Sequence, residues 1–541
     1  MAHFVNETNN IVTDAIDGAL AGSDGRLARI DGYPYIRVVL RKDWEKSRVA
    51  LISGGGSGHE PSHIGFVGEG MLTAAICGDI FASPSVDSIL AGILAVTGPA
   101  GCLLIVKNYT GDRLNFGLAA ERARGLGYKV EVVIVGDDIA LPGLAQPRGV
   151  AGTLFVHKIA GALAQDGADL SVVAAAAKRV AKRTISFGMS LDTCTVPGSP
   201  KETRIPSGKV ELGLGIHGEP GVQQINFEGS SKAIAFLADR MADEIRDQSC
   251  VALINNLGGT SPIEMSVILN DLRLSRVGKN ISHVIGPSTM MTSLEMHGFS
   301  VSLYPASGEE LVLLATQTPL PVWPGMFAIN TVQTVDMPDG LAPGQFSPSD
   351  NPAVRAMLIG CCERMIASKG DLNALDAKSG DGDTGSTLAR AADALISSID
   401  QLPLANPSNL CFAIAQQLSQ TMGGSFGVLI SIFLTATADA LKTNLPIIEA
   451  LKAGLERMQE IGGAKKGDRT VVDALEPALN ALPDGIFAAS KAARTGAEQT
   501  RGMRQAKAGR ATYVNATQLQ GYTDPGAEAV ARIFEQLASA D

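Results

Sequence analysis

The sequence predicts an α/β N-terminal half followed by an all-helical C-terminal half. Residues 49–135 alternate short apolar runs with a helix-forming segment. Residues 331–352 are rich in Pro, Gly, Ser and Asp, and the chain beyond them carries long Ala/Leu-rich segments with few strand signals. A length of 541 residues exceeds what one hydrophobic core serves, so roughly two to four domains are expected.

The α/β prediction rests first on a βαβ rhythm. Apolar runs at 48–52, 102–106 and 130–135 read as strands, and a helical segment at 114–124 ends near Gly125 and Gly127. Parallel strands need such crossover helices, so mostly parallel sheets are expected. A second α/β subdomain begins near Thr184, with strand candidates at 251–254 and 311–314.

The predicted boundaries follow from these signals. The N-terminal domain is expected at 1–330, with subdomains at about 1–183 and 184–330. A linker is expected at 331–352, because its Pro- and Gly-rich composition does not favour a packed core. The helical domain is expected at 353–541, with helices at 386–400, 425–441 and 473–482.

Composition excludes several classes of protein. A net charge of −10 without a basic block argues against a nucleic-acid partner. Seven cysteines, odd in number and without a CxxC pair, favour reduced thiols in a cytoplasm over a disulfide framework or a zinc site. The N-terminus lacks signal-peptide features, and the longest apolar run, 426–436, is too short to span a bilayer. A cytoplasmic protein without membrane contact is expected.

The loop 376–387 predicts a metal site. Asp376, Asp381 and Asp383 fall within eight residues and are separated by glycines, which allow the tight turn that three converging carboxylates need. Such carboxylates repel one another unless a hard cation lies between them, so the loop indicates Mg²⁺, which commonly accompanies phosphates.

The loop has two alternative interpretations besides a magnesium site. An EF-hand loop begun at Asp381 needs an acidic or amide residue at its fifth position and Glu at its twelfth, but Gly385 and Ala392 stand there. The other alternative is a polar turn in which Thr384 or Ser386 caps the following helix. A cap needs one oxygen and not three acids, so the metal site is favoured.

Glycine-rich loops in the first domain carry histidines. The segment 53–61 follows a strand, and His59 at its lip could act as an acid or base, or only cap a turn. His217 lies among glycines and could be a nucleophile, although an ordinary loop histidine is an equal alternative. Lys107 and Asp112 follow a strand end, where α/β folds bind ligands; the alternative is a pair of surface charges.

Neither common nucleotide motif is present. The 53–61 loop is not a dinucleotide fingerprint, because His59 stands at the third glycine position, and no Walker A sequence occurs. All seven histidines precede the linker. Histidine chemistry therefore belongs to the first domain and the cation to the second, so a reaction that needs both must bring the two domains together.

Several motifs together resemble the dihydroxyacetone kinases. Residues 54–61, 78–84, 107–112 and 215–220 look like that family's substrate domain. Asp376 with 380–383, and the segments 422–425, 467–470 and 524–526, look like its nucleotide domain. The resemblance covers nearly the whole chain, in the family's order. Both domains in one chain resemble the ATP-dependent single-chain members.

The resemblance implies an all-α helical-barrel C-terminal domain and a homodimer formed through the N-terminal domain. It implies that His217 binds the substrate carbonyl as a hemiaminal, that His59 and Asp112 are the acid–base residues, and that Asp376, Asp381 and Asp383 hold two Mg²⁺ ions with ATP. The implied substrate-binding residues are Gly56, Ser57, Gly58, His59, Lys107 and Asp112. The implied nucleotide-binding residues are Thr384, Gly385, Ser386, Thr387, Gly424, Ser425, Thr470, Asp524, Pro525 and Gly526. Phe426 stands where many relatives carry a small residue.

The leading hypothesis is ATP-dependent phosphorylation of dihydroxyacetone. Glyceraldehyde or a four-carbon erythrulose is an alternative substrate, because relatives with the same motifs differ in what they accept. A ketose-binding sensor without catalysis, and an additional activity that cyclises FAD to FMN, are alternatives of other classes. Phosphoryl transfer depends on positioning and charge neutralisation, which three carboxylates with Mg²⁺ supply.

Overall fold

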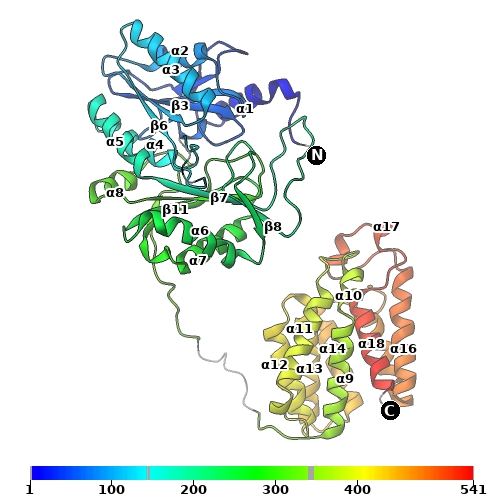
Figure 1. Ribbon diagram of the computed structural model, residues 1–541. Helices are drawn as coiled ribbons and strands as arrows, with labels where there is room; N and C mark the ends of the chain where they lie inside the picture. Colours follow the sequence, from blue (N-terminus) through cyan, green and yellow to red (C-terminus); the bar gives the residue numbers. More distant parts are fainter. Residues whose placement is uncertain (1–2, 142, 144–145, 339–345, 540–541) are drawn as a thin grey trace. The chain divides into compact units, whose positions relative to one another are not determined.

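The computed structural model describes residues 3–141, 143, 146–338 and 346–539. The chain divides into two compact units, 1–333 and 334–541. The division lies within the segment expected to be a linker, of which residues 339–345 are outside the described residues. Figure 1 shows an α/β first unit and a helical second unit, as predicted.

The first sheet of unit 1 has the strand order β1-β2-β4-β3-β5-β6. Strands β4, β3, β5 and β6 are parallel, while β1 and β2 join the edge antiparallel. Every residue of β3 is buried, as expected for a strand covered on both faces. The strands are β1 (Leu27–Arg29), β2 (Val38–Arg41), β3 (Ala50–Ser57), β4 (Ala74–Ile80), β5 (Cys102–Lys107) and β6 (Val130–Val135).

The second sheet has the order β13-β11-β10-β12-β7-β8-β9. Only the β10–β11 pair is parallel, so the expectation of mostly parallel strands is wrong for this sheet. β11 and β12 run in opposite directions on either side of β10, and the connection between them contains no helix; a crossover helix is the usual connection only between parallel strands. The strands are β7 (Ile185–Ser190), β8 (Lys209–Leu212), β9 (Gln223–Asn226), β10 (Cys250–Asn256), β11 (Ile281–Thr289), β12 (Gly298–Tyr304) and β13 (Met326–Ala328).

Helices separate and cover the two sheets (Figure 1). Helices α2 and α3 pack on one face of the first sheet, α4 and α5 lie on its other face, and α6 and α7 cover the far face of the second sheet. One apolar core joins α4 and α5 to both sheets. The helices are α1 (Ile11–Ala21), α2 (Val86–Val96), α3 (Thr110–Gly125), α4 (Thr153–Gln165), α5 (Leu170–Arg183), α6 (Ser230–Ile245), α7 (Pro262–Leu274) and α8 (Gly308–Ala315).

Helix α8 corrects a second expectation. The run 311–314 is helical and not a strand. Ser307 and Glu310 form a capping box, in which the serine side chain accepts the Glu310 N–H and the glutamate accepts the Ser307 N–H. These paired hydrogen bonds start a helix, so the local cap outweighs the apolar run as a signal.

Unit 2 is a closed ring of helices, which confirms the predicted helical barrel. Helices α9, α11, α12, α13, α14, α15, α16 and α18 contact one another in this order, and α18 returns to α9. The helices are α9 (Pro352–Ala367), α10 (Lys369–Asp376), α11 (Thr384–Ser397), α12 (Pro407–Thr421), α13 (Gly424–Lys442), α14 (Ile447–Gly462), α15 (Val472–Ala481), α16 (Ile486–Gln499), α17 (Ala516–Leu519) and α18 (Pro525–Ser539).

Helix α13 contains the apolar run 426–436 and is longer than that run. Among the described residues it is the one helix long and apolar enough to cross a membrane by length and composition alone. It contacts α12 and α14 within the ring of unit 2. An apolar helix packed among other helices has the same length and composition, so these two properties alone do not indicate a membrane span for α13.

Candidate active site

The loop that carries His59 begins at the carboxyl end of β3. Gly56 lies so close to the backbone of Phe81 and Ala82 that a Cβ would approach it at 2.7 Å. The Ser57 hydroxyl donates to the carbonyl of Gly78 at 2.9 Å. Glycine and a small hydroxyl therefore let the loop 54–61 pack tightly against the segment 78–82. Ser57 uses its hydroxyl to hold the loop.

His59 is completely buried and joins the two sheets of unit 1. Its Nδ1 lies 2.8 Å from the carbonyl oxygen of Thr292, which follows β11. Because a carbonyl only accepts, Nδ1 carries the proton and Nε2 carries the lone pair. Burial, with the charges of His217 and Lys107 adding to it, holds the pKa of His59 well below its usual range. His59 is therefore neutral at pH 7 and suited to accept a proton.

His217 follows β8 and lies beside His59. The ring centroids are 4.8 Å apart, and Tyr109 and Phe81 complete an aromatic enclosure with centroids 4.3 Å and 5.5 Å from His217. The side chain is 16% exposed, so a small ligand can reach it. The structure thus brings together the two histidines that the sequence placed in separate glycine-rich loops.

Glu219 determines which nitrogen of His217 is free. Its Oε1 lies 3.2 Å from His217 Nδ1, and its Oε2 accepts the His217 backbone N–H at 2.9 Å. Burial raises the pKa of Glu219, but the hydrogen bond and charge interaction with His217 outweigh it, so the pKa is lowered overall. An ionised carboxylate holds the proton on Nδ1 and leaves the Nε2 lone pair available for attack on an electrophile.

Lys107 and Asp112 lie on the same side of unit 1 as His59. Lys107 is the last residue of β5 and is completely buried, and Asp112 is in the first turn of α3 and is 2% exposed. The Lys107 Nζ is 3.2 Å from the carbonyl oxygen of Gly54. The Ser83 hydroxyl donates to Asp112. The alternative of two solvated surface charges is therefore wrong.

A separate cavity of about 690 Å³ lies on another side of the loop 54–61. It is bordered by α1 and by residues 319–322, and Ser57, Glu60 and Pro61 of the loop also line it. Neither His59 nor His217 lines it. The histidine cluster and this cavity are distinct places in unit 1.

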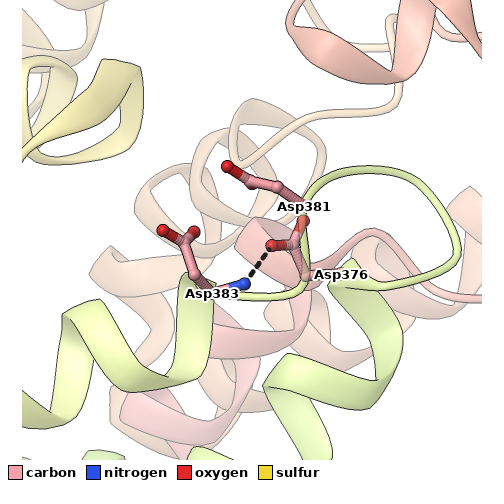
Figure 2. Close-up of side chains that lie close together, drawn as sticks. All are labelled: Asp376, Asp381 and Asp383. Atoms are coloured by element: carbon pink, nitrogen blue, oxygen red, sulfur yellow. Dashed lines mark hydrogen bonds between the residues drawn. The ribbon is translucent and has the colours of Figure 1, made fainter. Parts of the chain in front are cut away.

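The aspartate loop joins α10 to α11 in unit 2 (Figure 2). Oδ2 of Asp376 accepts the backbone N–H groups of Gly382, Asp383 and Thr384 at 3.0, 3.0 and 3.2 Å. A Cβ on Gly380 would overlap the Asp376 carboxylate, and Gly382 has a φ of +80°. Asp376 is buried and shapes the loop, whereas Asp381 and Asp383 are exposed.

The three carboxylates lie near one another. One oxygen from each of Asp376, Asp381 and Asp383 lies within 4.8 Å of the others. Opposite ligands of an octahedral Mg²⁺ are about 4.2 Å apart, so small side-chain rotations suffice to bind the ion. Hard oxygen donors and a backbone fixed by Asp376 fit Mg²⁺. This supports the predicted metal site over a simple helix cap.

Asn373 fixes the start of α11 beside these carboxylates. Its side chain accepts the Ser386 N–H and donates to the Ser386 hydroxyl, both at 2.9 Å. A Cβ on Gly385 would overlap the carbonyl of Lys369. Thr384–Thr387 therefore form a rigid helix N-terminus, where backbone N–H groups and the helix dipole favour an anion.

The other predicted nucleotide residues lie in loops or first helical turns at the same end of the ring. Neighbouring helices run up and down, so every second connection returns to one end: α10–α11, α12–α13, α14–α15 and α16–α18. Gly424 and Ser425 begin α13, Thr470 precedes α15, and Asp524–Gly526 lead into α18. The side chain of Lys378 over the ring of Tyr522, at 5.7 Å, links the aspartate loop to the last of these connections.

Asp524 and Phe426 order the start of α18. The Asp524 carboxylate accepts the Ala527 N–H at 2.9 Å. Burial raises the pKa of Asp524 to about 6, although this hydrogen bond and buried Arg469 act in the opposite direction. The Phe426 ring lies 3.2 Å from where a Cβ of Gly526 would stand. The large residue at 426 thus packs against the glycine of the 524–526 loop.

Three residues near these sites could not be singled out from the sequence: Glu219, Asn373 and His63. Glu219 lies in the motif 215–220, which is the one local signal that points to it. Asn373 lies before the aspartate loop, and nothing in its spacing marks it. The contact of His63 with Lys107 exists only in the folded chain.

Comparison with known proteins finds relatives that match both units of the chain. The Dak1 domain model matches residues 21–321 and the DAK2 domain model matches residues 378–539. The chain is 46% identical to dihydroxyacetone kinase of Citrobacter freundii, over 99% of both chains. It is 40% identical to human triokinase/FMN cyclase, over 99% of this chain and 98% of that protein.

A crystal structure of the C. freundii dihydroxyacetone kinase in complex with AMP-PNP and Mg²⁺ matches all of both chains, with a TM-score of 0.70 and 45% identity. The two domain models, the 46% identity over nearly the full length and the full-length structural match all indicate the same family. The chain belongs to the dihydroxyacetone kinase family of phosphotransferases.

Proposed function

We propose that this protein transfers the γ-phosphoryl group of ATP to dihydroxyacetone, which His217 holds as a hemiaminal. The observation that carries this proposal is the hydrogen bond between His217 Nδ1 and Glu219 Oε1, 3.2 Å long. It leaves the Nε2 lone pair of a partly exposed imidazole free within an aromatic enclosure. Such a nitrogen can attack a carbonyl carbon.

The covalent step balances within the site. Nε2 of His217 forms a bond to the carbonyl carbon, and the C=O π pair moves to oxygen, which takes up a proton. The imidazole loses its Nδ1 proton as the neutral hemiaminal forms, and the Glu219 carboxylate stands beside that proton. A polyol has no carbonyl, so glycerol cannot be held in this way and is predicted not to be phosphorylated.

His59 and Asp112 are proposed to handle the proton of the reacting hydroxyl. The Thr292 carbonyl orients His59 so that its Nε2 is the acceptor, and burial keeps the ring neutral. Asp112 is buried and is held by Ser83. A neutral imidazole or an ionised carboxylate can take the hydroxyl proton as the oxygen attacks phosphorus. Lys107, with Gly56, Ser57 and Gly58 of the loop, is proposed to contact the ketose.

ATP with Mg²⁺ is proposed to bind unit 2. Asp376, Asp381 and Asp383 fit Mg²⁺, and we propose two ions. Bound Mg²⁺ would neutralise phosphate charge. The N-terminus of α11 offers backbone N–H groups to phosphate oxygens. The loops with Gly424, Ser425, Thr470 and Asp524–Gly526 are proposed to surround the nucleotide.

The decisive test is ADP release with dihydroxyacetone, ATP and Mg²⁺. We expect turnover that depends on all three, is abolished by EDTA and returns with Mg²⁺. Intact mass spectrometry should show a dihydroxyacetone adduct on the wild-type protein and none on His217→Ala. Asp381→Asn and Asp383→Asn should retain the adduct and lose turnover. An adduct that persists on His217→Ala would exclude the covalent role of this residue, and no ADP release would favour a ketose sensor.

The name of the human relative favours testing further reactions. That protein, 40% identical over nearly its full length, is a triokinase/FMN cyclase. Glyceraldehyde and erythrulose therefore belong in the same kinase assay, and FAD with Mn²⁺ tests for FMN release. A homodimer through the first unit and a cytoplasmic location stay predictions.

A further inference from the structure

A buried polar cluster surrounds the side chain of Lys107. Lys107 is 0% exposed, and its Nζ contacts the Gly54 carbonyl oxygen at 3.2 Å and His63 Nε2 at 2.7 Å. An ammonium group has three N–H donors, so these two acceptors leave one donor. Within the described part of the chain Lys107 makes no direct ion pair. Its remaining N–H is therefore available to a ligand.

Gly55 shows where that donor is needed. A Cβ on Gly55 would lie 2.8 Å from Lys107 Nζ and 3.4 Å from Asp112 Oδ2. The first distance is too short for a carbon atom, so a glycine here lets the Lys107 ammonium approach the backbone. The ammonium and the Asp112 carboxylate face the same side of Gly55, and no side chain on residue 55 stands beside them. A hydroxyl bound next to both groups can accept from Lys107 and donate to Asp112.

His63 must be neutral to act as an acceptor for Lys107. His63 is 4% exposed, and burial holds its pKa well below the usual range, with the charges of Lys107, His157 and His59 acting in the same direction. His157, from the buried helix α4, packs its ring on His63 with centroids 5.4 Å apart and planes at 61°. Burial, followed by the charge of Lys107, lowers the pKa of His157 to about 3. Both rings therefore remain neutral.

We propose that His63 is a positioning residue of the ketose site: its Nε2 accepts a hydrogen bond from Lys107 and so directs the remaining N–H toward the reacting hydroxyl beside Asp112. His157 holds the plane of the His63 ring. This role rests on the proposed kinase activity. The charged or titratable groups around Lys107 are Asp112, His59, His63 and His157. Neither His63 nor His157 is proposed to contact the substrate.

The test compares His63→Leu, His63→Gln and His63→Asn. Leucine removes the acceptor. Glutamine places an amide oxygen near the position of Nε2, whereas the asparagine oxygen lies nearer the position of Nδ1. A hydrogen bond to a charged group is worth enough that we expect His63→Leu and His63→Asn to lower kcat/KM for dihydroxyacetone about ten- to a hundredfold, with glutamine recovering most of the loss. The KM for ATP should not change.

A pH profile separates positioning from a merely structural role. Without the neutral acceptor the Lys107 ammonium is less stabilised, so the alkaline limb of kcat/KM should move to lower pH in His63→Leu and return in His63→Gln. His297→Leu is the matched control, since His297 is 37% exposed and pairs with Glu264. Thermal unfolding reports whether each variant folds.

Each outcome is decisive. An inactive wild-type protein refutes the proposed function itself. If the wild-type protein is active and His63→Leu matches His297→Leu in kcat/KM and in its alkaline limb, the positioning role is wrong. If His63→Leu does not fold, the two amide variants decide: equal activity of His63→Gln and His63→Asn contradicts the role, and a selective recovery by glutamine supports it.

Discussion

Glu219 holds His217 by both of its carboxylate oxygens: Oε1 lies 3.2 Å from Nδ1 of the imidazole, and Oε2 accepts the backbone N–H at 2.9 Å. One acidic side chain thus fixes the tautomer of the proposed nucleophile and the conformation of its loop. Gly215 makes this arrangement possible, because a Cβ there would overlap the carboxylate of Glu219.

The first prediction concerns the charge of Glu219. Glu219→Gln should lower kcat/KM for dihydroxyacetone about ten- to a hundredfold, because a neutral amide is a weaker acceptor for Nδ1–H than a carboxylate and can also present its NH₂ to the ring. The rate of adduct formation, followed by intact mass, should fall with it, while the KM for ATP stays unchanged. Glu228→Gln, an exposed residue that pairs with Lys232, is the control. Normal adduct formation in Glu219→Gln would show that the tautomer needs no carboxylate.

Gly215→Ala should reproduce the loss seen in Glu219→Gln. The added methyl group forces the Glu219 carboxylate away from His217, since its Cδ would be 2.7 Å from the new Cβ. We expect kcat/KM for the ketose to fall at least about tenfold, the equivalent of one lost charged hydrogen bond. Gly117→Ala is the matched control, because a Cβ on this residue of α3 meets no atom within 4 Å. Equal activity of the two variants would contradict the steric argument.

Asp376 is expected to have two separable roles. Asp376→Asn keeps an oxygen that accepts the three N–H groups of the loop, so unit 2 should stay folded while Mg²⁺-dependent turnover falls at least about tenfold. Asp376→Ala should lose turnover and also lower the free energy of unfolding by about 1–3 kcal/mol, because buried donors lose their acceptor. Mg²⁺ titration and thermal unfolding measure the two effects. Equal thermal stability of both variants would show that the N–H groups find other partners.

Buried His157 predicts loss of stability in acid. Its folded pKa of about 3 lies below the unfolded value of about 6.5, so the unfolded state binds protons first as the pH falls through 6.5. The contribution is absent at pH 8 and lowers the free energy of unfolding by about 2 kcal/mol at pH 5. His63 and His59 act in the same direction.

His157→Phe tests this sign. The variant should lose less stability than the wild-type protein between pH 8 and pH 5, whatever its stability at pH 8. Chemical denaturation at both pH values gives the two differences. A variant with the same pH dependence as the wild-type protein would show that His157 is protonated in the folded state.

The strands and helices that the sequence predicted correctly are those with a strong local signal. Continuous apolar runs predicted β3, β5 and β6, and the Ala/Leu-rich segments predicted α11, α13 and α15. The prediction of a strand at 311–314 was wrong, because four apolar residues fit a strand or a buried helix equally well. The capping box at Ser307 makes this segment helical. The prediction of mostly parallel strands was also wrong for the second sheet, because strand direction depends on the edge of the sheet that each strand joins.

The sequence by itself determined which chemistry is possible. Three aspartates spaced by glycines predict a hard-metal site, because their backbone links hold them close whatever surrounds them. Only the tertiary structure decided how the histidines act. His59 and His217 come from loops of different sheets. The carbonyl of Thr292, distant in sequence, places the proton of His59 on Nδ1. The carboxylate of Glu219, which folds back on its own loop, does the same for His217. An imidazole has two nitrogens, and the hydrogen bond made by one determines what the other can do.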